Sequence, residues 1–185
     1  SGLAVLPGME VQTAEDVHVL CLFDTAEQAL TWQGIVFDHL PDRLNPVDIF
    51  GPQYVVDAAG EYVRTEDQLL AASVDLPIEE VVRRVRTLGG LAIPAHIDRP
   101  TFSLFASLGF VPPHLQVPAL EIFRFTDPHT FRAQHPELAP YTLIHSGDAH
   151  SLADISRAII LDCEAPTVAG LVAALTGQHG SVAFA

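Results

Sequence analysis

The chain has 185 residues, of which 49% are hydrophobic and 17% charged, a profile typical of one globular domain. Its nine basic residues are all arginine, and against 23 acidic residues they give a formal net charge of −14. This charge argues against a broad nucleic-acid groove, and the lack of lysine excludes Schiff-base chemistry. No apolar run is long enough to span a membrane and the first residues show no signal-peptide pattern, so we expect a cytoplasmic protein.

The pattern of apolar residues predicts strands at 3–11 and 17–23, followed by a helix from Thr25 to Leu40 with Thr25 as its cap and Gln28 three residues on. Two β-rich pieces around "DAAGE" predict a hairpin that leaves the main sheet. The further predicted elements are helices at 66–73, 77–89, 101–109 and 166–177, strands at 91–94, 119–123, 141–146, 157–163 and 181–185, and a polar segment up to 140.

Strands that alternate with helices indicate an α/β fold with parallel βα units, whose sites lie at the carboxyl ends of the strands. We expect residues 25–85 to contain an insertion that caps such a site. Cys21 and Cys163 lie in apolar runs, which favours buried free thiols over a disulfide framework.

Five acidic and histidine residues lie at predicted strand ends. Neutral imidazole and ionised carboxylate are ligands for zinc, manganese or iron, and a carboxylate can bridge two cations. Spacing alone does not settle their role, because an isolated D-x-H is common and a histidine in an apolar strand is more often a hydrogen-bonded core residue. The five are Glu10, His18, His96, Asp148 and His150.

Three fragments, "LPGMEVQTAEDVHVLCLF", "GGLAIPAHIDRP" and "HSGDAH", resemble in this order three motifs of the PHP family, the polymerase and histidinol phosphatase superfamily. The resemblance spans nearly the whole chain. It implies a distorted (β/α)7 barrel that hydrolyses phosphate esters with two or three divalent metals. The expected function is a metal-dependent phosphatase or phosphodiesterase that acts on a small phosphorylated metabolite or a nucleotide through a metal-bound hydroxide.

Carried over to this sequence, the resemblance implies a role for each residue. Glu10, His18 and His96 would hold one metal, Asp148 a second and His150 a third. Arg99 corresponds to an arginine that contacts the substrate phosphate, so Arg99 and Asp148 are the expected catalytic residues. Ile97 stands where the family usually has proline, which could shift the loop that carries Arg99.

The family normally carries an H-x-H pair, a further ligand and a "TDH" segment before the "GxE" motif, and this sequence begins just before that motif. We therefore expect an incomplete barrel with one metal or none and impaired turnover. Truncation, proteolysis and a second polypeptide that supplies the ligands all remain open. Exposed sheet edges would favour pairing of two chains as a homodimer.

Several weaker expectations complete the sequence analysis. His145 would support the site from behind, Glu121 is either a substrate contact or structural, and the remaining histidines His114, His129, His135 and His179 are expected at the surface. The alternative function is a non-catalytic PHP-like metal-binding or regulatory module. An amidohydrolase-like enzyme is disfavoured because such enzymes usually employ a bridging lysine.

Overall fold

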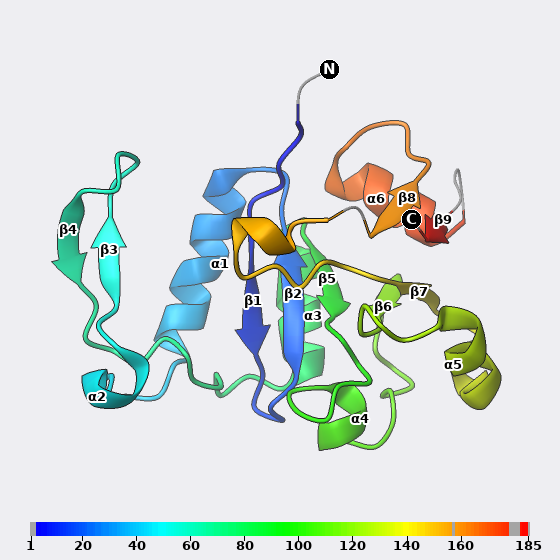
Figure 1. Ribbon diagram of the computed structural model, residues 1–185, viewed down its shortest axis with the longest axis horizontal. Helices are drawn as coiled ribbons and strands as arrows, with labels where there is room; N and C mark the ends of the chain where they lie inside the picture. Colours follow the sequence, from blue (N-terminus) through cyan, green and yellow to red (C-terminus); the bar gives the residue numbers. More distant parts are fainter. Residues whose placement is uncertain (1–2, 157, 178–181, 185) are drawn as a thin grey trace.

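The computed structural model describes residues 3–156, 158–177 and 182–184 (Figure 1). At its centre lies a three-stranded sheet in the order β1-β2-β5. Because β2 is antiparallel to both neighbours, the ends of β1 and β5 and the start of β2 lie at one edge of the sheet. The strands are β1 (Gly8–Gln12), β2 (His18–Leu22) and β5 (Leu91–Pro94).

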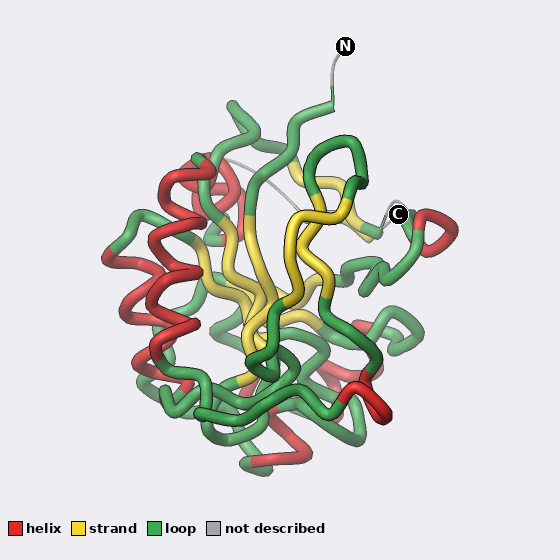
Figure 2. The backbone as a smooth tube through the Cα atoms, turned by 90° about the vertical axis from the view of Figure 1, so that its left-hand side faces the viewer, coloured by secondary structure: helices red, strands yellow, loops and turns green. Residues whose placement is uncertain are grey.

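The two faces of this sheet are buried against different partners. Val19 and Cys21 of β2 belong to the core that contains α1 and α3, whereas Leu20 and Leu22 pack against a second core that includes α6. Figure 2 shows the strands beside a layer of helices. The helices of the first core are α1 (Ala26–Asp38) and α3 (Ile78–Thr87), and the helix of the second is α6 (Val168–Leu175).

The remaining strands form three two-stranded sheets. The β6–β7 pair is parallel and β6 lies beside β5, the β8–β9 pair is antiparallel, and the β3–β4 hairpin projects from the body of the molecule (Figure 1). The bounds are β3 (Tyr54–Val56), β4 (Tyr62–Thr65), β6 (Ala119–Glu121), β7 (Thr142–Ile144), β8 (Ile159–Leu161) and β9 (Val182–Phe184).

The mixed α/β class is confirmed, but within the described residues the strands close no barrel. Of the parallel pairing that the alternation of strands and helices predicted, the described residues show only the β6–β7 pair. The connection from β1 to β2 is too short for the crossover that parallel strands need, and it makes a hairpin.

Local sequence signals were reliable where they describe a cap or a turn. Thr25 caps α1: the Gln28 amide donates to the Thr25 hydroxyl, and the Thr25 amide donates to the Gln28 side-chain oxygen, as the capping-box pattern predicted. In the "DAAGE" turn the Asp57 carboxylate accepts bonds from the Ala59 and Glu61 amides. The shorter helices are α2 (Val47–Phe50), α4 (Leu104–Ser107) and α5 (Pro128–Gln134), with 3₁₀ turns at Pro136–Leu138 and Leu152–Asp154.

Two predicted elements were wrong. No helix forms at 66–73, because long-range bonds hold this stretch extended: the Asn45 amide donates to Asp67 O and the Gln53 side chain donates to Glu66 O and Gln68 O. The segment read as polar loop contains α5, which Asp127 caps. The first strand begins at Gly8 rather than at residue 3, and the expectation for His179 lies outside the described residues.

Both cysteines are free, as expected, although only Cys21 is buried and Cys163 is half-buried. Burial raises the pKa of the Cys21 thiol, so it is an inert core residue. None of the helices in the described residues has the length and apolarity of a membrane span.

Replacement of Gly90 by alanine is expected to destabilise the fold by about 1–3 kcal/mol, because the new Cβ would lie 2.5 Å from the ring of buried Phe23 and 2.8 Å from Leu22 O. Gly34→Ala is the matched control. It lies inside α1, where the new Cβ would meet no atom within 4 Å apart from the adjacent residues and the backbone of its own helix, and it should stabilise by about 0.5–1 kcal/mol. Urea unfolding measures both changes, and a Gly90→Ala protein as stable as the parent would contradict the packing described.

Candidate metal centre

Three of the expected ligands meet at the edge of the central sheet. Glu10 and His18 lie on the same face of the β1–β2 hairpin, and His96 follows β5 at the same edge. One ligand atom from each lies within 4.8 Å of the other two. Glu10 Oε1 is next to His18 Nδ1 and 3.9 Å from His96 Nε2. This set of one carboxylate and two imidazoles suits a single divalent cation.

His96 has an unusual environment for a histidine. It is buried to 2% exposure, and neither ring nitrogen has a hydrogen-bond partner among the described residues. His18 Nδ1 is likewise buried and makes no hydrogen bond of good geometry. Buried polar atoms normally find partners. The close contact of His18 Nδ1 with Glu10 and the unpartnered nitrogens of His96 nearby fit a site that a cation would complete.

The electrostatics of the cluster favour the ionised carboxylate. The imidazoles of His18 and His96 hold the pKa of the Glu10 carboxyl well below its usual range. Burial by itself lowers the pKa of His96, but the Glu10 carboxylate outweighs it and the net shift is upward. Glu10 is therefore ready to bind a cation at neutral pH, whereas His96 must first be free of its proton.

Two residues with strained backbone belong to this cluster or touch it. The non-glycine residues with positive φ among those described are Asp16 at 59°, His96 at 30°, Phe102 at 56° and Asp148 at 44°. His96 is a member of the cluster, and the ring of Phe102 stacks on His18 with centroids 5.0 Å apart. Such conformations cost energy and persist mainly at functional sites, so they single out this edge of the sheet.

Asp148 and His150 lie near the cluster but outside the set of converging ligand atoms. Asp148 Oδ2 accepts a bond from Arg99 at 2.8 Å, and the side chain of His150 is 83% exposed with its Nδ1 2.9 Å from Asp148 O. The structure therefore brings Arg99 and Asp148 together and leaves His150 pointing largely to solvent.

A cavity of about 500 Å³ joins the two groups of residues, since Glu10, Glu121, Ser146, Asp148 and His150 all line it. Glu121 is 4% exposed, and burial raises the pKa of its carboxyl to about 7. This position was open in the sequence analysis, and the structure places it in the cavity, where it can hold or release a proton near neutral pH.

Two supporting residues were missed in the sequence. The Asp98 carboxylate accepts bonds from the Phe123 amide and the Thr126 hydroxyl, which fixes the loop after β6 beside the "PAHIDR" segment. The position of Asp98 between the motif residues His96 and Arg99 could have indicated its role. Phe102 had no such signal, because its position depends on a positive φ that the sequence does not reveal.

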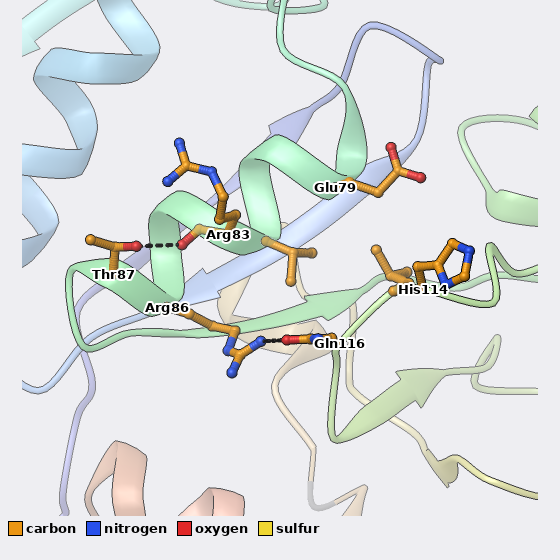
Figure 3. A pocket seen from close by; sticks show the side chains of 8 residues that line it. Glu79, Arg83, Arg86, Thr87, His114 and Gln116 are labelled. Carbon is orange, nitrogen blue, oxygen red and sulfur yellow. Dashed lines mark hydrogen bonds between the residues drawn. The ribbon is translucent and has the colours of Figure 1, made fainter.

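A separate cavity of about 560 Å³ lies between α3 and the segment before β6 (Figure 3). Arg86 donates to Gln116 across it, and Arg83 is already paired with Glu80 on its own helix. It shares no lining residue with the metal cluster. Its exposed His114 therefore offers a control position for experiments on the site.

Comparisons with known proteins give a structural likeness only. No family model matches the sequence, and no curated protein does so either. The lesion-specific endonuclease PfuEndoQ from Pyrococcus furiosus superposes with a TM-score of 0.65 at 17% identity, over 96% of this chain and 40% of the endonuclease. Endonuclease Q in complex with a 27-mer duplex substrate that has an abasic lesion at the active site superposes with a TM-score of 0.60 at 18% identity, over 92% of this chain and 38% of the endonuclease.

The expected restriction to a small phosphorylated substrate, without a nucleic-acid groove, is contradicted by the second structure, in which endonuclease Q holds duplex DNA. The expectation came from the net charge of the whole chain, which does not report the local potential of a site where cations and arginines gather. The present chain spans about two fifths of the length of these two proteins. At this level of identity the likeness shows the fold alone.

Proposed function

We propose that this protein is a metal-dependent phosphodiesterase that acts on nucleic acid. The observation that carries the proposal is the convergence of Glu10, His18 and His96, with the buried nitrogens of His96 unpartnered among the described residues. A divalent cation bound there would supply Lewis-acid chemistry, which lowers the pKa of water and neutralises phosphoryl charge. Zinc, manganese and iron all suit these ligands.

The other residues of the polar cavity have separate roles in this proposal. Asp148 and His150 would bind further cations, as the motif resemblance implies. Arg99 lies against Asp148 and is half-buried, so its planar guanidinium can hold two phosphoryl oxygens at the edge of the cavity. The Glu121 carboxyl, with a pKa raised to about 7 by burial, can pass a proton to or from an oxygen of the phosphate ester.

Nucleic acid is proposed as the substrate class on two grounds. The structural likeness is to endonucleases, one of them in complex with a DNA duplex. The loop after β6 also presents Arg124 and the 76% exposed Phe125 beside the cavity, where Arg124 donates to Gly147 O and lies 4.9 Å from the centre of the Phe125 ring. An arginine and an exposed aromatic ring are the groups that hold a phosphate backbone and a base.

Strand cleavage by the full natural polypeptide tests this function. With manganese and a labelled DNA duplex, His96→Ala and Asp148→Ala are each expected to lower the cleavage rate by about 100-fold or more, because each removes a ligand of a cation that would stabilise charge at the phosphate. His114→Ala, in the cavity beside α3, should cleave like the parent. Undiminished cleavage by the His96 and Asp148 variants would refute the assignment.

The second candidate is a metal-binding or regulatory module without catalysis. It is favoured by the engagement of Asp148 with Arg99 and by the exposure of His150, which leave one complete ligand set among the described residues. It predicts cation binding by the Glu10 cluster and no cleavage of any phosphate ester, so the same assay separates the two candidates.

A further inference from the structure

The metal cluster lies between two cavities of different character. Glu10 lines the polar cavity described above and also a second one of about 390 Å³, whose other polar walls are Gln12 and His18. The rest of the second cavity is apolar. Its main apolar side chains are Val36, Leu40, Phe50, Leu70, Val74 and Phe102.

Phe102 is held in place at this cavity at an energetic cost. Its backbone adopts a φ of 56°, which disfavours any side chain larger than glycine. The His18 amide donates to Phe102 O at 3.1 Å, and the ring lies 7° from parallel to the His18 imidazole. Even so, 43% of the residue is exposed. A large aromatic side chain is thus fixed against a metal-ligand candidate while part of it stays in contact with solvent.

Phe50 and Leu70, which line the same cavity, are also open to solvent, at 55% and 48% exposure. They belong to the 25–85 segment that the sequence analysis expected to cap the site. The volume is in the range of small-ligand sites. Glu10 and His18 of the cluster form part of the cavity wall and apolar side chains form most of the rest, so a fitting ligand carries its charged group at the cluster and a flat apolar group against the other walls.

We infer that this cavity is the subsite for an unpaired nucleobase next to the phosphate that is cleaved, with the base stacked at Phe102. The inference rests on the proposed function. A nucleotide has the required polarity, because its phosphate would lie at Glu10 and His18 while the face of its base covers the apolar walls. Stacking on an aromatic ring tolerates different bases, so the subsite selects for an unstacked base rather than for a sequence.

Binding of two DNA oligonucleotides that differ at one position tests the subsite. Both have one flexible unpaired position, which is a 2-aminopurine nucleotide in one strand and an abasic nucleotide in the other. Binding affinities are measured with calcium in place of manganese. The parent should bind the 2-aminopurine strand roughly ten-fold more tightly and quench its fluorescence. Phe102→Ala should lose both the preference and the quenching, whereas Phe102→Trp should keep them.

Phe125→Ala is the matched control, because Phe125 is exposed outside this cavity and its loss should weaken binding of both strands alike. Melting temperatures verify that each variant folds. Equal affinity of the parent for the two strands, or a preference that survives in Phe102→Ala, would overturn the subsite even if manganese-dependent cleavage is present. Failure to bind either strand would overturn the subsite and nucleic acid as the substrate class together, and the cleavage assay reports separately on the proposed chemistry.

Discussion

Addition of a divalent cation is expected to raise the melting temperature of this chain, and His96→Ala is expected to abolish the rise. A ligand at 100 times its dissociation constant stabilises the folded state by about 2.7 kcal/mol, which for a chain of this size corresponds to roughly 5–10 °C. His96 provides a buried nitrogen to the cluster without another partner among the described residues, so its removal leaves too few ligands for tight binding.

The measurement compares thermal unfolding with chelator and with manganese or zinc, and only the difference between the two conditions is interpreted. His96→Ala alters packing as well, and this affects both conditions equally. His114→Ala should retain the full rise. A parent protein with no rise, or a His96→Ala protein that keeps it, would show that the Glu10 cluster is not a metal site.

Acid should reduce the cation-dependent rise in melting temperature. The pKa of Glu10 is held far below its usual range, so protonation of His96, not of the carboxylate, limits binding as the pH falls. The pKa of His96 is raised, so competition from the proton begins at a higher pH than for an ordinary histidine. The cation-dependent rise should therefore decline as the pH falls through the histidine range.

The Glu10 cluster could be anticipated from sequence because the resemblance to the PHP motifs groups its three residues, each of which lies in a strand or within two residues of one. Antiparallel pairing of β2 with β1 and β5 then brings the three positions to one edge. The partners of Asp148 and His150 could not be anticipated. Asp148 and His150 lie in the loop after β7, where Arg99 donates a hydrogen bond to the Asp148 carboxylate. The three-dimensional course of that loop decides which groups these two side chains contact.

Of the two errors in the fold, only the wrong helix at 66–73 has the same physical origin. Residues 66–73 have local helical character, but backbone and side-chain bonds to distant residues such as Asn45 and Gln53 stabilise an extended path. The α5 helix was overlooked although its Asp127 cap and following proline are visible in the sequence. Contacts between distant residues, rather than weak local signals, thus account for the wrong helix, whereas the missed one had a readable start.

Replacement of Glu121 by glutamine is expected to make the metal-free protein more stable at pH 8 and to change little at acidic pH. Burial raises the pKa of the Glu121 carboxyl from 4.5 in the unfolded chain to about 7 in the folded one. Between these values the folded protein binds the proton that the unfolded chain has lost, so stability falls as the pH rises. Above both values the ionised, buried carboxylate costs about 3 kcal/mol relative to its protonated form.

Glutamine keeps the shape of the protonated acid and cannot ionise, so the gain should grow from nearly zero around pH 4.5 toward about 3 kcal/mol at pH 8, or roughly 6–12 °C. Urea unfolding in chelator measures it, since a bound cation would stabilise the ionised form. Gly34→Ala removes no titratable group, so it is the control and should give a difference that does not vary with pH. If the Glu121→Gln difference were also constant between pH 5 and 8, the carboxyl would have to be ionised normally, and it could not act as the proton carrier of the polar cavity.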